Sequence, residues 1–180
     1  MTTYVALLRG LGFPNTLPMQ ALVRLLERLG LRDVRTYIQS GNAVFHAAKA
    51  DAKLGAKITA AIDKAHGFAP PTLILTHAEL KKAMSANPFK AAGGDTAAVL
   101  FTFLFEKPKA PDLAAIERLL KPNERCALKG KVFYFLAPDG VGRSKAFARI
   151  EKSLGVAGTA RNGRSVANLE QLAREVAAVR

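Results

Sequence analysis

The two halves of this 180-residue sequence repeat one order of predicted elements, and this repeat constrains the fold more than any other feature. The order is strand, helix, strand, strand, helix, strand, and an additional helix follows each copy. Such an order is typical of the split βαβ plan. The sequence therefore predicts an α+β protein of two tandem ferredoxin-like subdomains, residues 1–90 and 91–180, with antiparallel sheets whose helices pack on one face.

The element boundaries follow from hydrophobic periodicity and from turn residues. In the first subdomain we expect strands at 3–9, 34–39, 43–47 and 71–76, and helices at 18–30, 51–67 and 77–84. In the second we expect strands at 97–105, 125–130, 131–137 and 156–160, and helices at 111–120, 142–155 and 165–179. Gly41-Asn42 fits a type II′ turn between the middle strands of the first subdomain. Lys129-Gly130 or Gly130-Lys131 forms the equivalent turn of the second.

This topology predicts a polar edge in the first subdomain, because both strands of a β-α-β crossover point the same way. The loop 10–18 then lies beside the hairpin that contains Ser40 and Gly41. The candidate ligand-binding residues of this edge are Arg9, Asn15, Gln39, Ser40 and Asn42. Such cations and hydrogen-bond donors near a helix N-terminus suit an anion or a phosphate. Asn and Ser are also ordinary turn residues, so packing within the hairpin is the alternative interpretation.

A second polar cluster, TARNGRS, occupies residues 159–165, and Ser165 is the expected N-cap of the last helix. Two arginines at a positive helix end repel each other unless a negative group joins them. The candidate ligand-binding residues here are Arg161, Asn162, Arg164 and Ser165. A predicted basic patch surrounds them and comprises Arg143, Lys145, Arg149 and Lys152. A phosphate, or an acidic side chain from elsewhere in the chain, would neutralise this cluster.

Composition limits the classes of function. The net charge of +13 favours nucleic acid, small phosphorylated ligands or acidic partners, although it also fits a solvated surface of no specific role. Because Cys126 is the single cysteine, an intramolecular disulfide is excluded, and we expect a buried, inert thiol at this position. The three histidines are far apart and lack ligand spacing, so we expect no metal site and no cofactor. We expect a cytoplasmic protein without a membrane segment, because no apolar run approaches a membrane span.

Six stretches along the sequence form a recognisable pattern: ALLRG (6–10), PM (18–19), VRTYIQSGNAVF (34–45), NPF (87–89), SK (144–145) and TARN (159–162). Together they resemble the domain-of-unknown-function 1697 family. The resemblance implies a pair of ferredoxin-like units and carries no established activity. Two departures concern possible sites. Phe13-Pro14 stands where the family usually has glycines, and Gly163 stands where it usually has a tryptophan.

Three classes of function stay open at this point. The first is a binding protein for nucleic acid or another phosphate-rich anion. The segment KGKVFYF (129–135) echoes the aromatic motif of RNA-recognition modules, but Phe133 and Phe135 are expected in the core. The second class is a small-molecule binding protein or an enzyme with a site at the edge formed by loop 10–18 and the hairpin, although no catalytic constellation is identifiable. The third is a structural or regulatory module with a protein partner of unknown kind.

Overall fold

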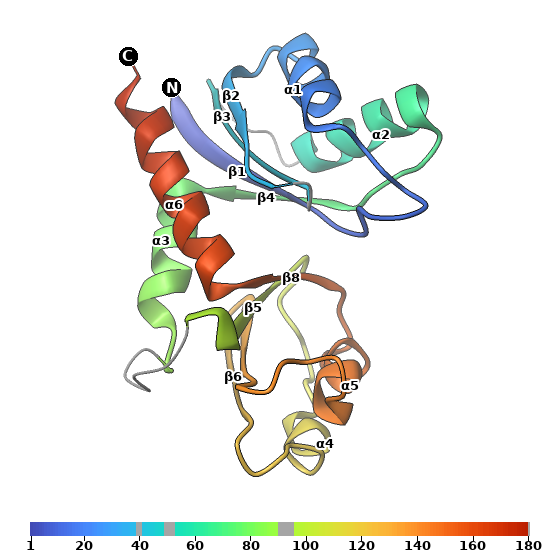
Figure 1. Ribbon diagram of the computed structural model, residues 1–180, viewed down its shortest axis with the longest axis vertical. Coiled ribbons are helices and arrows are strands. Elements are labelled where there is room, and N and C mark those ends of the chain that lie inside the picture. The colour runs from blue at the N-terminus through green and yellow to red at the C-terminus, as the bar shows by residue number, and fades with distance from the viewer. Residues whose placement is uncertain (39–40, 49–52, 90–95, 180) are drawn as a thin grey trace. The chain divides into compact units, whose positions relative to one another are not determined.

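The computed structural model describes residues 1–38, 41–48, 53–89 and 96–179 (Figure 1). Within these ranges the chain forms two four-stranded antiparallel sheets and six α-helices, in the order that the sequence predicts. The chain divides into two compact units. Unit 1 comprises Met1–Lys82 and Ala167–Arg180, and unit 2 comprises Ala83–Val166.

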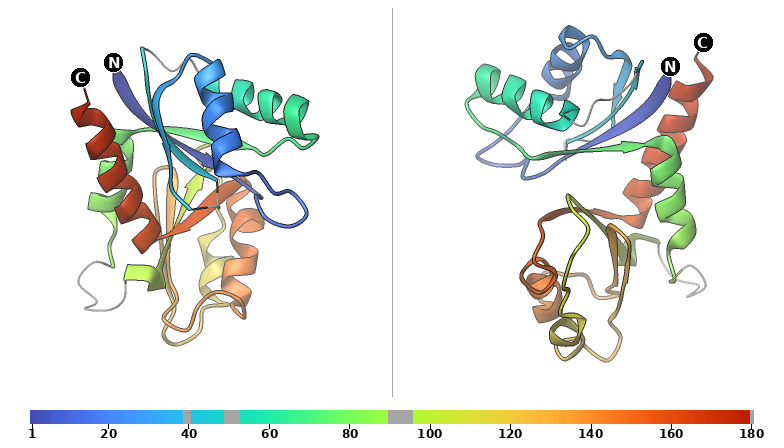
Figure 2. Two further views of the ribbon diagram at one scale, coloured as in Figure 1. Left: turned by 45° about the horizontal axis from the view of Figure 1, so that its top comes forward. Right: turned by 180° about the vertical axis from the view of Figure 1, so that it is seen from behind.

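The sheet of unit 1 has the strand order β2-β3-β1-β4. Its strands are β1 (Thr2–Leu8), β2 (Arg32–Thr36), β3 (Asn42–Ala47) and β4 (Thr72–Thr76). Helices α1 (Met19–Arg28) and α2 (Leu54–His66) cover one face of this sheet (Figure 2). Side chains alternate along a strand, so Tyr4, Ala6 and Leu8 of β1 all point to this face. There they join a core that includes Leu22, Leu26, Phe45, Ile58 and Ile62.

Helix α6 (Gly163–Ala178) lies on the opposite face of the same sheet. The Asn168 side-chain amide donates to the Tyr37 hydroxyl at 2.6 Å, and Arg35 pairs with Glu175 at 3.2 Å. These contacts explain why residues from Ala167 onward belong to unit 1. The division that the sequence predicts, between residues 90 and 91, instead assigns the whole of α6 to the second subdomain, because α6 follows the second set of strands in the sequence.

Helix α3 (His77–Ala86) begins directly after β4 at a capping box. The Thr76 backbone N–H donates to the Glu79 carboxylate at 2.7 Å, and the Glu79 N–H donates to the Thr76 hydroxyl at 3.1 Å. Each side chain thus satisfies a backbone donor that the first helical turn leaves unpaired. This reciprocal pair allows the chain to pass from strand to helix without a loop.

The sheet of unit 2 has the equivalent strand order, β6-β7-β5-β8. Its strands are β5 (Val99–Leu104), β6 (Arg125–Lys129), β7 (Val132–Leu136) and β8 (Gly158–Asn162), and a 3₁₀ turn (Thr96–Ala98) precedes β5. Helices α4 (Leu113–Glu117) and α5 (Lys145–Leu154) pack on one face around Phe133 and Phe135. The expectation that these two aromatic residues belong to the core is confirmed. On the other face Phe101 and Tyr134 make an edge-to-face contact with ring centroids 5.2 Å apart.

The two hairpins differ in how well their turns were predicted. In the second hairpin Lys129 pairs with Val132, so Gly130-Lys131 is the turn, as one of the two alternatives states. In the first, Asn42 is already part of β3, where it pairs with Leu7. The type II′ turn at Gly41-Asn42 is therefore wrong, because pairing with β1 draws Asn42 into the sheet.

None of the helices in the described part of the chain is long and apolar enough to cross a membrane.

Candidate functional site

The edge predicted from the crossover topology forms in unit 1. The backbone N–H of Leu8 donates to the carbonyl of Gly41 at 2.8 Å. A Cβ atom at Gly41 would lie 2.7 Å from Leu11 Cδ1 and 2.8 Å from Leu8 Cβ, so the hairpin packs tightly against the start of the loop. The prediction that the loop after β1 lies beside the hairpin is confirmed, and glycine is required there by space and by its left-handed φ of 77°.

Asn42 serves the hairpin itself. Its side chain is fully buried, and its amide nitrogen donates to the Tyr37 carbonyl at 3.0 Å. The Asn42 carbonyl in turn accepts from the Tyr37 N–H at 3.1 Å. A buried amide that satisfies a neighbouring backbone carbonyl matches the packing interpretation of the motif.

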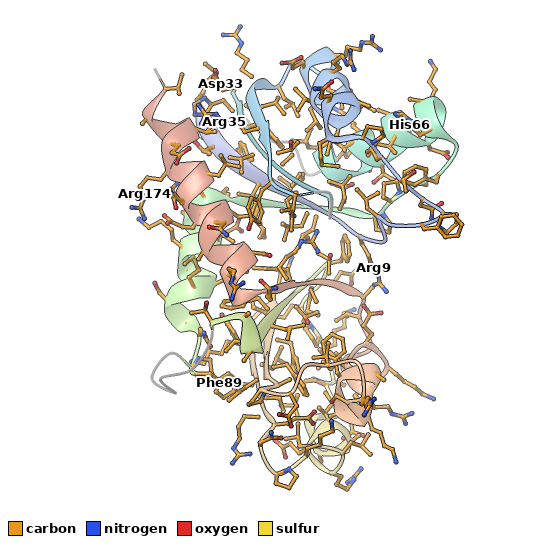
Figure 3. All side chains as sticks on the ribbon, viewed as in Figure 1. Arg9, Asp33, Arg35, His66, Phe89 and Arg174 are labelled. Atoms are coloured by element: carbon orange, nitrogen blue, oxygen red, sulfur yellow. The ribbon has the colours of Figure 1, made fainter. Side chains whose placement is uncertain are left out.

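Of the other residues predicted for this edge, the structure describes Arg9 and Asn15. Arg9, which is labelled in Figure 3, follows β1 and is half-exposed. Its backbone N–H donates to the Pro71 carbonyl at 2.9 Å. Asn15 is exposed, and its carbonyl accepts from the Gly12 N–H at 3.1 Å within the loop. Gln39 and Ser40 lie outside the described residues.

Arg161 lies in the middle of the second predicted site, but it is buried. Only 9% of its surface is exposed, and Nη1 donates at 2.8 Å to both the Thr159 hydroxyl and the Ala160 carbonyl. Burial lowers the pKa of Arg161 to about 10, so the guanidinium is still charged at neutral pH. This side chain stabilises β8 through local hydrogen bonds.

Asn162 caps the last helix. Its side-chain oxygen accepts from the Ser165 N–H at 2.8 Å, and α6 begins at Gly163. The prediction of Ser165 as the N-cap is therefore wrong by three positions. The helix starts earlier than expected because the Asn162 side chain satisfies the Ser165 N–H, so residue 165 already belongs to the first turn. Ser165 is buried in the first turn, and Arg164 is exposed beside it.

The four residues of the predicted basic patch are all exposed, and three of them belong to α5. Lys145, Arg149 and Lys152 recur at i, i+4 and i+7, so they share one helical face, and Arg143 lies just before the helix. We call these four residues the α5 basic face. In the part of the chain that the structure describes, no ion pair joins any of them to an acid. The neighbouring acid, Glu151, accepts a hydrogen bond from the Gly158 N–H at 3.1 Å.

Arg161 does not lie on the same side of the sheet as this helix. It pairs with Phe101, whose ring contacts Tyr134, on the sheet face away from α4 and α5. Sequence proximity groups Arg161 with the α5 cations, but the alternation of side chains along β8 separates them. Lys145, Arg149 and Lys152 are therefore exposed on one face of α5, whereas Arg161 is buried on the other side of the sheet.

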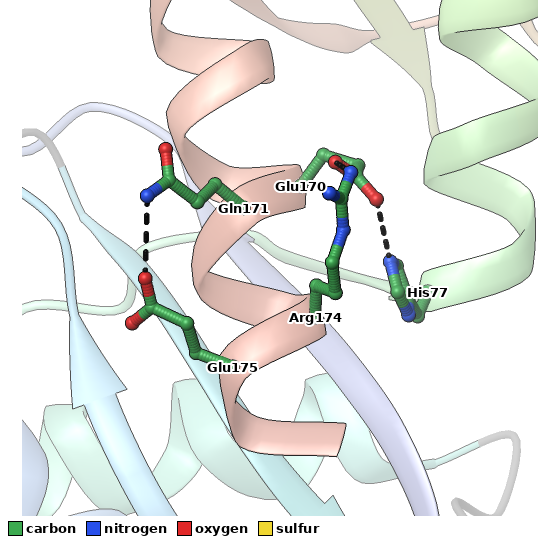
Figure 4. A network of polar contacts seen from close by, with 5 residues as sticks. All are labelled: His77, Glu170, Gln171, Arg174 and Glu175. Carbon is green, nitrogen blue, oxygen red and sulfur yellow. Dashed lines mark hydrogen bonds and ion pairs between the residues drawn. The ribbon is translucent and has the colours of Figure 1, made fainter. Parts of the chain in front are cut away.

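A polar network between α3 and α6 escaped the sequence analysis (Figure 4). Buried Glu170 contacts His77 Nε2 at 3.1 Å and accepts from Arg174 Nη2 at 2.7 Å. Burial alone raises the pKa of the Glu170 carboxyl, but the hydrogen bonds and charges of His77 and Arg174 outweigh it and leave the pKa below its ordinary value. The i, i+4 spacing of Glu170 and Arg174 was a visible signal, whereas the contact with His77 depends on tertiary structure.

Two further residues with titratable side chains, His46 and Cys126, are buried or half-buried. His46 is buried, with Nδ1 3.0 Å from Asp33 Oδ2. Burial, with a smaller contribution from the charge of Glu117, raises the pKa of the half-buried Cys126 thiol, which disfavours the reactive thiolate. Among the described residues, no group of three His, Cys, Asp or Glu side chains is arranged to hold a metal ion.

The chain is similar in fold to a solved structure described as "The structure of conserved bacterial protein SP0830 from Streptococcus pneumoniae". The match has a TM-score of 0.71 and 23% sequence identity, and it covers 96% of this chain and 98% of that one. No curated protein matches the chain.

A family model described as "Protein of unknown function (DUF1697)" matches residues 1–134. The matched stretch contains the TYIQSGN motif of the first hairpin, whereas the segments 144–145 and 159–162 lie beyond it. Because the match covers most of the sequence, the chain belongs to the DUF1697 family.

Proposed function

We propose that this protein binds nucleic acid, or another phosphate-rich polyanion, through the α5 basic face. The observation that carries the proposal is a set of four exposed cations on one short surface without an acid paired to any of them in the described part of the chain. Cations without partners attract the phosphates of a nucleic acid, and binding releases the counterions that are condensed on those phosphates.

The position of the cations on the helix adds to this attraction. Arg143 and Lys145 flank Ser144, the N-cap, whose hydroxyl accepts from the Phe147 N–H at 3.1 Å. The first turn of α5 holds no acidic residue. Two cations at the positive end of a helix are unfavourable by themselves, and a bound phosphate would remove this repulsion.

The spacing also fits a phosphate backbone. Lys152 lies seven positions after Lys145, which corresponds to about 10 Å along the helix axis. Phosphates of one strand of duplex DNA recur every 3.4 Å or so along its axis, so the three helical cations would span roughly three of them.

Base stacking is not part of the proposed mode. Tyr134, Phe133 and Phe135 are fully buried, and the Tyr134 hydroxyl donates to the Ala83 carbonyl at 2.7 Å. Aromatic residues in such positions offer no platform for bases. Binding through the α5 basic face would therefore be directed at phosphates and tolerant of sequence.

Fluorescence anisotropy with labelled single- and double-stranded RNA and DNA tests this function. The decisive variant carries Lys145→Gln, Arg149→Gln and Lys152→Gln. With duplex DNA, the slope of log affinity against log salt concentration should become shallower by about 2 to 3, because each phosphate contact contributes roughly 0.9. Arg161 is a poor target for the same test, because its burial makes loss of folding the first effect of any substitution.

A matched control removes three exposed cations from other positions of unit 2, through Lys107→Gln, Lys109→Gln and Arg118→Gln. It should keep most of the affinity and of the salt slope. Equal losses of affinity in both triple variants would show that binding depends only on net charge. Absence of binding at low salt would contradict the proposed function.

We also infer that each unit has the ferredoxin-like fold. The support is the repeated β-α-β-β-α-β order and the equivalent strand orders of the two sheets. An experimental structure that pairs β1 with both β3 and β4, and β5 with both β7 and β8, is the expected result.

A ligand site at the edge formed by loop 10–18 and the hairpin remains the alternative function. Soaking crystals of the protein with phosphate would test it.

A further inference from the structure

A groove of about 560 Å³ lies between α1 and α2 in unit 1, on surfaces that the sequence analysis did not single out. Five of its nine lining residues are apolar, and we call them the floor of the groove: Ala21, Leu25, Leu29, Ala61 and Ala65. Leu29 is 38% exposed, although it continues the apolar stripe of α1. The groove therefore presents apolar side chains to solvent between two helices.

The other four lining residues are basic, and we call them the walls of the groove. Arg24 and Arg28 come from α1, and Lys64 and His66 come from α2. Figure 3 labels His66 at the end of α2. All four are exposed, and no residue that lines the groove is acidic. No ion pair joins these four side chains to any acid among the described residues. The groove thus combines an apolar floor with positive walls on both sides.

We propose that this groove binds an acidic amphipathic helix of a partner protein. Grooves between two helices accept the apolar face of a third helix, with anchors at i, i+3, i+4 and i+7. Three of the five floor residues are alanines, so the backbone of an incoming helix can approach closely. Carboxylates beside the apolar stripe of that helix would then meet the basic walls.

The register of the walls supports a helical partner. Arg24 and Arg28 are one turn apart, so their side chains are neighbours on the surface of α1. Glu residues at i and i+4 of an antiparallel or parallel helix have the same spacing and would face them. Glu27 and Asp63 precede Arg28 and Lys64 in the sequence, but neither acid lines the groove. The charge of the walls therefore stays complementary to an acidic helix.

A small molecule is a poorer occupant. Sites for small ligands enclose most of the ligand and use a few polar groups that are fixed in place. Here every polar side chain of the lining is an exposed Arg, Lys or His. The groove also lies in the unit that does not contain the α5 basic face, so the two binding activities can be tested separately.

The test uses the full chain and a labelled synthetic peptide of about five helical turns, with leucines at i, i+3, i+4 and i+7 and glutamates beside them. A matched peptide carries lysine in place of every glutamate. We expect the glutamate peptide to bind with micromolar affinity in fluorescence anisotropy and the lysine peptide not to bind. The double substitution Arg24→Glu and Arg28→Glu should lower the affinity for the glutamate peptide by more than about tenfold, or 1.4 kcal/mol.

Two controls separate this groove from general charge effects. Lys81→Glu with Lys82→Glu makes the same change in net charge on exposed positions of α3 and should leave binding within about twofold. The variant with Arg24→Glu and Arg28→Glu should gain affinity for the lysine peptide, which a misfolded protein would not do.

Three results would overturn the proposal. One is equal binding of the two peptides to the unmodified protein. Another is an equal loss of affinity in the α3 control. The third is no binding of the glutamate peptide up to millimolar concentration.

Discussion

Gly41 has a left-handed backbone conformation with a φ of 77°, and a Cβ atom there would lie 2.8 Å from Leu8 Cβ. The Leu8 atom is attached to the backbone of β1 and cannot rotate away. Gly41→Ala should therefore destabilise the protein by about 2 to 4 kcal/mol, the sum of left-handed strain and overpacking. Urea denaturation followed by circular dichroism measures this change.

Gly67 is the matched control for that substitution. It has a similar φ of 75° at the C-terminal end of α2, and a Cβ atom there would meet nothing within 4 Å. Gly67→Ala should therefore cost only about 1 kcal/mol, from backbone strain alone. Equal costs at Gly41 and Gly67 would show that the contact with Leu8 contributes nothing.

Single residues also show where sequence reasoning about the site reached its limit. The edge between the first loop and the hairpin was predictable, because the crossover rule places both segments there. The burial of Asn42 and Arg161 was not, because it depends on which strand pairs beside each of them. Asn42 pairs with Leu7 and Arg161 pairs with Phe101, and these pairings join segments far apart in the sequence.

At the scale of elements, the start of α6 depends on Asn162, whose side chain accepts from the Ser165 N–H. Asn162→Ala should destabilise the protein by about 1 kcal/mol, the usual cost of losing an N-cap. Ser165→Ala should cost less, because the Ser165 side chain is not the cap. Thermal denaturation of the two variants distinguishes them, and a larger loss for Ser165→Ala would restore the original assignment of the cap.

The network between α3 and α6 predicts a pH dependence. The folded-state pKa of Glu170 lies below its ordinary value of 4.5, so ionised Glu170 stabilises the fold above that pH. This contribution is lost as the pH falls through the folded-state pKa. Glu170→Gln should cost about 2 kcal/mol at neutral pH, since it removes charge-assisted bonds to His77 and Arg174, and the difference from the unmodified protein should shrink in acid.

Glu175 provides a control on the same helix. It pairs with Arg35, and both side chains are about half exposed. Exposed ion pairs contribute little, so Glu175→Gln should change stability by less than about 1 kcal/mol. Urea titrations between acid and neutral pH compare the two variants. A pH-independent loss in Glu170→Gln would contradict the role of its charge.

Periodicity predicts the order of the α-helices and strands in the described part of the chain, because apolar spacing is a local signal. Local signals set the ends of elements less well. β8 ends at Asn162, two residues beyond its expected end, because its pairing with β5 extends to Leu100. The capping box of Thr76 and Glu79 was readable from its spacing, whereas the connection of the first hairpin required knowledge of β1 pairing.

At the scale of the whole molecule, the net charge of +13 is partly organised into surfaces. The α5 basic face belongs to unit 2, and the groove with basic walls belongs to unit 1. The first has no apolar floor and suits phosphates, whereas the second combines charge with exposed leucine and alanine. Composition alone could not separate these two kinds of surface, because both contribute to the same total.

The division of the chain predicts an asymmetric response to truncation. Unit 1 consists of two segments, Met1–Lys82 and Ala167–Arg180, which enclose unit 2 in the sequence. A chain that ends at Val166 should therefore lose structure in unit 1, although the residues removed follow the last strand of unit 2. Leu169, Ala173 and Val176 of α6 are fully buried.

Removal of these side chains, and exposure of the sheet face that they leave, should cost several kcal/mol at about 1.5 to 3 kcal/mol for each large aliphatic group. That loss is comparable to the stability of a typical domain. Hydrogen exchange should show faster exchange in β1, β3 and β4 of the truncated chain and retained protection in β5 and β7. Loss of protection confined to β5–β8 would instead support a division in which the whole last helix belongs to residues 91–180.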